Sequence, residues 1–199
     1  MKICIAQHYT SNLSYASFSE DINRRYAENN GYDYYVEKDD EKIKRTLSLD
    51  ENGWKSDIIL HPTWYKPSLI LEVFESLSPD YVLFLDADAI VSDPDKRIEE
   101  YINEDYNFVG PDDTSEHSVL CAGVFLIKNC DWSIRFLKRW MGLARALKPT
   151  EVKNLSFPES EKDNMTFFST GLWHDQSALT YMHSNIKEVR DKIKILPSS

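Results

Sequence analysis

The sequence predicts an α/β domain in which a mainly parallel central sheet is flanked by helices. Short apolar segments of strand length alternate along the chain with amphipathic segments of helical period. Glycine and proline stand at many of the boundaries between these segments. The length of 199 residues suffices for one domain with a substantial core and is too short for two full-sized ones. We therefore expect residues 1–199 to form a single domain.

The first half of the chain opens with a strand–helix–strand unit, which is right-handed by default. Ser17 and Glu20 have the spacing of a capping box at the start of its helix, and Gly31 suits a left-handed stop at its end. Apolar residues recur every four positions along one face of this helix: Phe18, Ile22 and Tyr26. Residues 38–62 carry mixed charges and are predicted to form a long loop. The elements expected before residue 92 are strands over 1–7, 32–37 and 81–91, and helices over 17–30 and 64–77.

The second half is expected to add strands over 108–111, 119–129 and 192–196, and helices over 92–102, over 132–147 and within 171–184. Gly123 interrupts its strand, which indicates a bulge or a place where a ligand approaches the backbone. Asp131 is positioned to cap the next helix. The core-facing stripe of that helix is Trp132, Phe136, Trp140, Ala144 and Leu147. Residues 150–170 are polar and lack periodicity, and a connection of this length indicates binding or motion.

The acidic composition restricts the partners. A net charge of −10 argues against nucleic acids and anionic membranes, because surfaces that seek phosphate need an excess of Lys and Arg. Cys4, Cys121 and Cys130 are odd in number and lack CxxC spacing, which indicates buried thiols in a reducing compartment. No secretory signal pattern opens the chain, and no apolar run reaches membrane-spanning length. The expected location is therefore cytoplasmic, with no membrane span.

Two aspartates follow the most apolar strand of the chain. The segment from Tyr81 to Val91 carries Asp86 and Asp88, separated by a single alanine. Residues two apart in a strand point the same way, so both carboxylates can converge on one cation at the carboxyl end of the strand, where open α/β sheets bind ligands. Unpaired carboxylates beside apolar residues are costly to desolvate. The pair therefore indicates a hard divalent cation, Mn²⁺ or Mg²⁺, that also binds phosphate oxygens.

Two other interpretations of this pair stay open. In the first, the two acids have only a structural role and cap the following turn or pair with Lys66 or Arg97. In the second, the chain is a haloacid-dehalogenase-like phosphatase, in which an apolar strand also ends in DxD and the first Asp attacks phosphate. That motif usually opens the chain and continues with a small residue and then Thr or Val. Here about eighty residues precede the motif, and Ala89 and Ile90 follow it.

Four blocks, in chain order, resemble the GT-A-fold family of galactosyl-, mannosyl- and xylosyltransferases that includes the xyloglucan xylosyltransferases. They are RRYAENNGYDYYVE, WYKPSLILEVFESLSPDYVLFLDADAIV, CAGVFLIKNCDWSIRFLKRW and WHDQSALTYM. Together with their spacing they cover most of the chain. The resemblance implies a GT-A fold, a nucleotide-sugar donor that we expect to be a UDP-sugar, and a glycan or glycoprotein acceptor.

The resemblance also implies how the donor diphosphate and sugar are bound. Asp86 would contact the ribose or the metal, and Asp88 the metal itself. Ala122 and Gly123 would lie near the donor sugar, where larger residues would collide with it, although Ala122 also fits a tight strand–helix packing contact. Lys66 would neutralise phosphate or orient the aspartates; the alternative is an ordinary exposed lysine at a helix start.

The base of the nucleotide is expected at the end of the first strand. In this fold that position usually receives the base, and here it carries Ala6, Gln7 and Tyr9. Tyr9 would stack on the base, unless it belongs to the core as many tyrosines do. The assignment follows from the resemblance and not from the residue types alone.

Catalytic roles are implied for the segment His174, Asp175 and Gln176. His174 replaces an acid of the family and departs from the family pattern at this position. Asp175 would orient donor or acceptor hydroxyls, or only cap the helix that starts there. Gln176 would lie by the anomeric carbon and stabilise an oxocarbenium-like transition state. The family retains anomeric configuration, and we favour front-face attack assisted by the departing phosphate over double displacement. The metal would act as a Lewis acid on the diphosphate.

One block of the family has no counterpart in this sequence. Members carry a later His, beyond the strand that matches residues 192–196, as a further metal ligand, and this chain ends at Ser199 before that block. Either His183 or His174 substitutes for it, or the chain is truncated from a longer protein, which is the option we expect. Members also carry membrane anchors, and none is expected in this chain. Small soluble glycosyltransferases encoded by large algal viruses have the same character, so the resemblance extends to a soluble virus-encoded member that modifies a capsid.

The expected function is thus metal-dependent glycosyl transfer from a nucleotide-diphosphate sugar. A non-catalytic domain that binds a sugar nucleotide is the first alternative, because the terminal His block is missing and His174 departs from the family. The phosphatase is the second.

Overall fold

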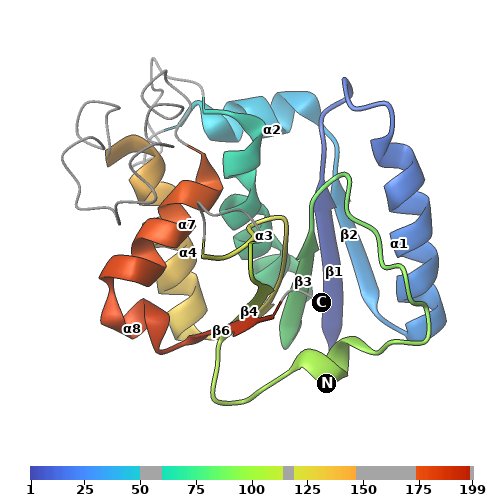
Figure 1. Cartoon of the computed structure of the whole chain (residues 1–199). Coiled ribbons are helices and arrows are strands. Elements are labelled where there is room, and N and C mark those ends of the chain that lie inside the picture. The colour runs from blue at the N-terminus through green and yellow to red at the C-terminus, as the bar shows by residue number, and fades with distance from the viewer. Residues whose placement is uncertain (50–59, 114–118, 147–173, 198–199) are drawn as a thin grey trace.

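The computed structural model describes residues 1–49, 60–113, 119–146 and 174–197. Its strands are β1 (Ile3–His8), β2 (Asp33–Glu37), β3 (Tyr81–Leu85), β4 (Phe108–Pro111), β5 (Val124–Lys128) and β6 (Ile193–Leu196). They form a single six-stranded sheet in the order β2-β1-β3-β5-β4-β6 (Figure 1). β5 runs antiparallel to β3 and β4, and the other neighbouring strands are parallel. The predicted fold class, a mainly parallel sheet flanked by helices, is confirmed.

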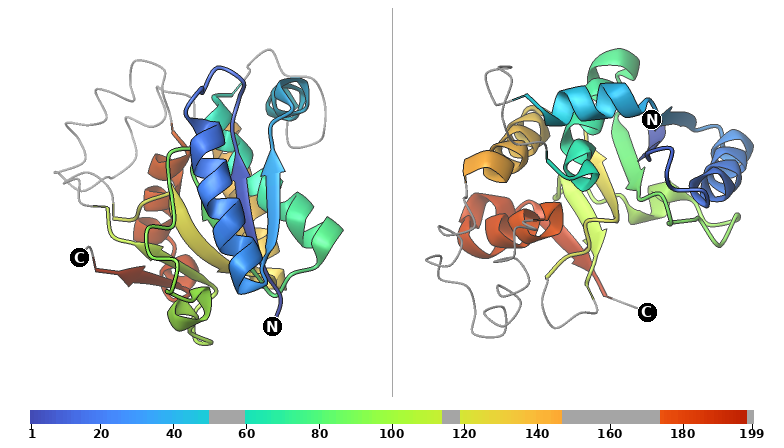
Figure 2. Two further views of the ribbon diagram at one scale, coloured as in Figure 1. Left: turned by 90° about the vertical axis from the view of Figure 1, so that its right-hand side faces the viewer. Right: turned by 90° about the horizontal axis from the view of Figure 1, so that it is seen from above.

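Helices cover both faces of this sheet. They are α1 (Ala16–Asn30), α2 (Asp40–Leu47), α3 (Lys66–Leu77), α4 (Asp131–Ala146), α7 (Asp175–Asn185) and α8 (Lys187–Arg190), with short 3-10 helices η1 (Pro62–Tyr65) and η2 (Ile98–Tyr101). α1 lies on one face, and α3, α4 and α7 lie on the other (Figure 2). α3 and α4 were predicted from their apolar periodicity and α7 as a short helix after a turn, and the left-handed conformation predicted for Gly31 is present, with φ of 73°.

The larger core lies between the sheet and α3, α4 and α7. The ring of Phe125 stacks on Phe84 and Phe108, with centroid distances of 5.1 and 4.7 Å. Trp140 of α4 is fully buried against the same cluster, as its place in the predicted stripe indicated. Each such aromatic side chain stabilises the fold by roughly 1.5–3 kcal/mol through burial. This packing fixes where the ends of β3 and β5 lie.

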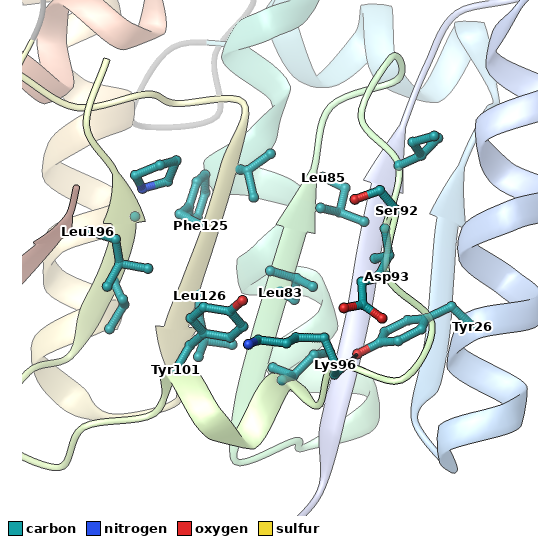
Figure 3. A pocket seen from close by; sticks show the side chains of 17 residues that line it. Tyr26, Leu83, Leu85, Ser92, Asp93, Lys96, Tyr101, Phe125, Leu126 and Leu196 are labelled. Carbon is teal, nitrogen blue, oxygen red and sulfur yellow. Dashed lines mark hydrogen bonds between the residues drawn. The ribbon is translucent and has the colours of Figure 1, made fainter. Parts of the chain in front are cut away.

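The second face of the sheet is only partly covered. A cavity of about 320 Å³ lies over β3, β4 and β5, where Leu83, Leu85, Val109 and Leu126 face it (Figure 3). The segment that includes η2 forms its other wall and contributes Lys96. None of the predicted site residues lines this cavity. Leu85 and Val124, which do line it, are the chain neighbours of Asp86 and Gly123.

α1 buries a polar face, and this corrects two predictions. The capping box of Ser17 and Glu20 is not formed, because the helix begins at Ala16 without a side-chain cap. Phe18, predicted on the apolar face, is 68% exposed. The buried face of α1 instead carries Ser19 and Asn23, whose side chains bond to backbone carbonyls of the turn and loop after β3. Tyr26 of the predicted stripe is buried, so the apolar period located part of this face correctly. It missed the polar part, which can be buried because its groups are hydrogen-bonded.

Residues 38–62 are not a continuous loop, because α2 forms within them. The side chain of Asp39 accepts hydrogen bonds from the backbone N–H groups of Glu41 and Lys42, and Ile43 and Leu47 are buried. Asp39 is a standard N-cap residue type, so the sequence did contain a signal for this helix. The run of charged residues led to the prediction of a loop in place of this helix.

Three further boundaries differ from the predictions. β3 ends at Leu85, so Asp86 and Asp88 lie in the turn after the strand and not within it. β5 begins at Val124, so Gly123 precedes the strand and does not interrupt it. The helix predicted over 92–102 is reduced to the 3-10 helix η2. The predicted connection over 150–170 lies outside the described residues.

Candidate active site

Four chain segments meet at the carboxyl end of β3. Because β5 is antiparallel to β3, its first residue, Val124, pairs with the last residue of β3, Leu85. The segment before β5 therefore lies beside the turn after β3, and the backbone N–H of Asp86 donates to the carbonyl of Gly123 at 2.7 Å. The starts of α3 and α7 reach the same place. Sheet topology thus brings together residues that are far apart in the sequence.

Lys66 lies at the centre of this meeting point. Its Nζ is 3.0 Å from Asp86 Oδ1 and 2.8 Å from Asp175 Oδ2, and it donates a hydrogen bond to the carbonyl of Ala122 at 3.1 Å. The contact with Asp175 lacks the angular geometry of a hydrogen bond and is an ion pair. Lys66 is 2% exposed, so its interpretation as an ordinary exposed lysine is wrong. The buried ammonium offsets part of the negative charge of the two carboxylates that it faces.

The charged groups of this cluster shift one another's pKa values. Burial raises the pKa of the Asp86 carboxyl to about 6, although the ammonium of Lys66 acts against the shift and Asp175 and Asp88 add to it. Burial by itself would lower the pKa of Lys66, but Asp175 and Asp86 raise it above its ordinary value. Lys66 is therefore a fixed positive charge.

Asp88 has a different environment from Asp86. It is exposed, and no residue in the described part of the chain makes a hydrogen bond or ion pair with its side chain. The side chain of Asp86 is 34% exposed and contacts Lys66 on one side. Of the two predicted structural partners, Lys66 does pair with Asp86, whereas Arg97 pairs with Glu99 and bonds to Asn30 at the end of α1. One carboxylate of the DxD pair is thus held in place and the other is accessible.

The turn that carries these aspartates is fixed by side chains of β1 and α1. Gln7 Nε2 donates to the carbonyl of Asp86 at 3.1 Å, and Asn23 Nδ2 donates to the carbonyl of Ala89 at 2.8 Å. The backbone N–H of Val91 donates to Asn23 Oδ1 at 2.9 Å. Asn23 Nδ2 also donates to Gln7 Oε1 at 3.1 Å. Gln7, which was predicted to meet the nucleotide, therefore orients the backbone of Asp86.

The other residues predicted to bind the base are placed as follows. Ala6 is fully buried in the larger core. Tyr9 is half-buried, and its hydroxyl donates to the carboxylate of Glu20 on α1. Burial and the neighbouring Glu20 raise the pKa of Tyr9 to about 12. The hydroxyl of Tyr9 is thus held, and its contact with a base stays a prediction.

Gly123 leaves room for the carboxylate of Asp86. A Cβ atom at this position would lie 2.8 Å from Asp86 Oδ2, closer than such atoms approach in proteins. Ala122 is buried, as its packing interpretation required, and its backbone also serves the site through both polar groups. Its carbonyl accepts from Lys66, and its N–H donates to Gln176 Oε1 at 3.0 Å.

Asp175 and Gln176 open α7 at the edge of the same cluster. Asp175 is 3% exposed and is the first residue of α7, whose N-cap residue is His174, so Asp175 faces Lys66 and does not cap the helix. Its carbonyl accepts a hydrogen bond from the indole of Trp140 at 2.8 Å. Gln176 Nε2 donates to Asp113 Oδ2 at 2.6 Å. Sequence reasoning missed Asp113, because nothing in its local pattern marks it.

The histidines differ in their distance from this cluster. His174 lies beside His61, with a ring-centroid distance of 5.6 Å, and its partial burial lowers its pKa although Asp175 acts against this. His183 lies nine residues further along α7, about 13 Å at the rise of an α-helix. Whether His183 or His174 could serve as a metal ligand stays a prediction.

His8 is a further residue that sequence reasoning missed. It is 7% exposed at the end of β1 and lies between the rings of Tyr65 and Phe84. Within the described part of the chain, neither of its ring nitrogens has a hydrogen-bond partner. Burial, with the nearby positive charge of Lys66, lowers the pKa of His8 to about 3. His8 is therefore a neutral imidazole beside the charged cluster.

The donor atoms available to a metal are two carboxylates. Among the described residues, no group of three or more His, Cys, Asp and Glu side chains is arranged to hold an ion. Asp86 and Asp88 present hard oxygen donors, and Asp88 has no counter-ion among those residues. This donor set fits a divalent ion such as Mn²⁺ or Mg²⁺ whose remaining ligands are phosphate oxygens and water.

A protein-family model matches the part of the chain that contains most of this site. The model of a family described as "Protein of unknown function, DUF273" matches residues 24–155, two thirds of the chain. The chain belongs to this family. The DUF273 match includes Lys66, the DxD turn, Ala122 and Gly123, whereas β1 and α7 lie outside it.

Curated relatives of this DUF273 chain are plant proteins. It is 31% identical over 109 residues to "Probable glycosyltransferase 7" of Oryza sativa subsp. indica, a match that covers 52% of this chain and 24% of that protein. It is 30% identical over 132 residues to "Probable glycosyltransferase 6" of the same plant, covering 63% and 26%. The chain thus spans about a quarter of the length of these relatives.

Solved structures share the fold at low sequence identity. A glycosyltransferase involved in the glycosylation of the major capsid of PBCV-1 superposes with a TM-score of 0.64 and 14% identity, covering 99% of this chain and 82% of that one. The glycosyltransferase GlyE of Streptococcus pneumoniae TIGR4 gives 0.56 and 16%, covering 98% and 45%. The predicted GT-A fold is confirmed. Within the described ranges, no helix is both long and apolar enough to cross a membrane.

Proposed function

We propose that this domain is a glycosyltransferase that moves a sugar from a nucleotide-diphosphate donor, a UDP-sugar, to a glycan or glycoprotein acceptor. The observation that carries the proposal is the cluster of Lys66, Asp86, Asp175 and Gln176 at the carboxyl end of β3 in a GT-A fold. The similarity to plant proteins described as glycosyltransferases supports the same class. A virus-encoded origin has no support beyond the fold shared with the PBCV-1 enzyme.

The donor diphosphate would bind at the turn after β3. Asp88 and the exposed side of Asp86 would hold Mn²⁺ or Mg²⁺, which when bound acts as a Lewis acid and offsets the charge of the leaving diphosphate. Lys66 holds Asp86 from the opposite side, so this carboxylate needs no rearrangement when the donor arrives. Gly123 leaves space beside Asp86 for the donor.

The environment of Asp175 supports front-face transfer with retention of configuration. A carboxylate nucleophile needs access to the anomeric carbon, but Asp175 is 3% exposed and its Oδ2 lies 2.8 Å from Lys66 Nζ. Its contacts instead favour a structural role, in which Asp175 neutralises Lys66 and begins α7. Gln176 is half-buried and presents its amide at the same edge, where it would stabilise the developing charge at the sugar. The departing phosphate would then take the proton of the acceptor hydroxyl.

The proposal is tested by a panel of UDP- and GDP-sugars with Mn²⁺, scored for binding, for hydrolysis and for transfer to glycan acceptors, with a chelator as control. We expect UDP-sugars to bind and turn over only with metal. Asp88→Asn should abolish both, whereas Asp95→Asn, at an exposed aspartate of the same loop, should leave both unchanged. Binding that is equal with chelator, or unchanged in Asp88→Asn, would contradict the proposal.

The alternatives give different results in the same assay. A domain that only binds sugar nucleotides would bind UDP-sugars with metal and never release free sugar or a transferred product. A phosphatase of the haloacid-dehalogenase type would turn over a generic phosphomonoester with Mg²⁺, which we do not expect from a GT-A fold.

A further inference from the structure

The side-chain amide of Gln176 is held at both ends by protein groups. Its Oε1 accepts from the backbone N–H of Ala122 at 3.0 Å, and its Nε2 donates to Asp113 Oδ2 at 2.6 Å. A carbonyl oxygen against an N–H and an NH₂ against a carboxylate define the orientation of the amide without ambiguity. The plane of this amide is therefore set by two groups on opposite sides of it.

From this geometry we infer that Asp113 is a positioning residue for glycosyl transfer, acting through Gln176; the inference rests on the proposed function. A Gln amide has two N–H donors and an oxygen with two lone pairs. Asp113 occupies one N–H and Ala122 one lone pair, so with respect to the residues that the structure describes, one N–H and one lone pair stay available in a fixed direction. Without Asp113, the amide could rotate about its last torsion, which is soft.

The place of Asp113 in the fold suits this role. It follows β4, two residues after Pro111, whose carbonyl accepts from the N–H of Cys121 at 3.1 Å. The backbone N–H of Asp112 donates to the carbonyl of Leu196 on β6 at 2.8 Å. These bonds tie the end of β4 to its neighbours, so the carboxylate is presented from an anchored backbone. A charge-assisted hydrogen bond from such a position restrains its partner more than a neutral one.

The test compares Asp113→Ala, Asp113→Asn and the control Asp112→Ala. Asp112 is exposed and adjacent in sequence, and in the described part of the chain its side chain makes no hydrogen bond with Gln176. For Asp113→Ala we expect kcat for transfer to fall about tenfold, with KM for the donor nearly unchanged. Asp113→Asn keeps an oxygen acceptor and should recover most of the loss. Asp112→Ala should match the wild type.

A double-mutant cycle separates positioning from direct contact with a substrate. If Asp113 acts through Gln176, adding Asp113→Ala to Gln176→Ala should cause no further loss of kcat. Additive losses would overturn the inference, as would wild-type kcat in Asp113→Ala.

A second readout does not depend on activity. The side-chain amide resonances of Gln176, assigned by their absence in Gln176→Ala, should move in Asp113→Ala and stay in place in Asp112→Ala. Unmoved resonances would overturn the inference even if no donor were found. If the resonances move but no donor in the panel turns over, the proposed function fails and the role of Asp113 in transfer fails with it. The two failures are therefore distinguishable.

Discussion

At the scale of single residues, two positions are constrained by their surroundings. His8 is a buried neutral imidazole, and Gly123 is a position where a side chain would collide with a carboxylate of the site. Neither follows from residue type. A histidine is often partly exposed, and a glycine beside a strand often marks only a turn. Each makes a prediction that one substitution can test.

Acid should destabilise the protein through His8. Folding lowers the pKa of His8, so the folded state favours the neutral imidazole. This contribution to stability is fully present above the pKa of the unfolded state and is lost as the pH falls below it. With a folded pKa of about 3 against an unfolded value of about 6.5, the loss is about 2 kcal/mol between pH 7 and pH 5. His8→Phe should remove this loss. The measurement is the free energy of unfolding in urea for both proteins across that range.

The quantity to compare is the difference in unfolding free energy between the wild type and His8→Phe. Asp86 changes the stability with pH in the direction opposite to His8. Its pKa is raised to about 6 in the folded state, so its contribution falls as pH rises from about 4 to 6. Both proteins keep Asp86, and its effect cancels in the difference. A difference in unfolding free energy that does not vary with pH would contradict the burial of a neutral His8.

Gly123→Ala should displace the carboxylate of Asp86. The new Cβ would lie 2.8 Å from Asp86 Oδ2, and that oxygen is held by Lys66. We expect a loss of roughly 1–3 kcal/mol in unfolding free energy and at least tenfold weaker binding of UDP with Mn²⁺. Gly142→Ala is the control. Its Cβ meets nothing within 4 Å in α4, and alanine should stabilise that helix by about 1 kcal/mol. Equal effects of the two substitutions would contradict the close approach.

At the scale of elements, α1 does more than cover the sheet. Its buried polar residues hold the turn and loop that follow β3, through Ser19 to the carbonyl of Ala87 and through Asn23 to Ala89 and Val91. The position of Asp88 therefore depends on a helix that precedes it by about sixty residues. α1 is part of the site although it contributes no group that would contact the donor.

Asn23→Ala should loosen the DxD turn. The substitution removes three hydrogen bonds and leaves the carbonyl of Ala89 and the N–H of Val91 without their partner. We expect a loss of about 2–4 kcal/mol in unfolding free energy, because buried polar groups left unpaired cost more than the bonds contribute. Amide hydrogen exchange at residues 87–91 should accelerate. Asn29→Ala, on the exposed face of the same helix, should change stability by less than about 0.5 kcal/mol. Unchanged exchange in Asn23→Ala would show that α1 does not hold the turn.

At the scale of the whole molecule, Lys66 links segments from the first and second halves of the chain. Its ammonium contacts the turn after β3, the segment before β5 and the start of α7. The site is therefore assembled only when the antiparallel β5 has inserted between β3 and β4 and α7 has packed on α4.

Lys66→Met should be among the most destabilising single changes in this chain. Methionine matches the length of the lysine stem, but Asp86 and Asp175 then lose their shared cation, and a buried pair broken on one side costs about 3–5 kcal/mol. Chemical denaturation measures the loss. Lys44→Met, at an exposed lysine of α2, is the control and should be nearly neutral. A loss under about 1 kcal/mol for Lys66→Met would contradict the central position of this ion pair.

The sequence by itself determined the α/β class, the helices α3 and α4, the left-handed Gly31 and the segment that carries the two aspartates. These features depend on local patterns: periodicity, chain punctuation and an apolar strand that ends in acids. Lys66, Asp175 and Gln176 were singled out through a resemblance of motifs, and the structure brings them together with Asp86.

Only the tertiary structure decided which groups face one another. The antiparallel placement of β5 between β3 and β4 puts Ala122 and Gly123 beside Asp86, and no local pattern encodes that adjacency. The same holds for Asn23, Asp113 and His8, which are polar residues that a pattern assigns to the surface. They are buried or half-buried because the folded chain places them near the strand ends that form the site. Their charge and hydrogen bonding therefore depend on their neighbours in space and not on their neighbours in sequence.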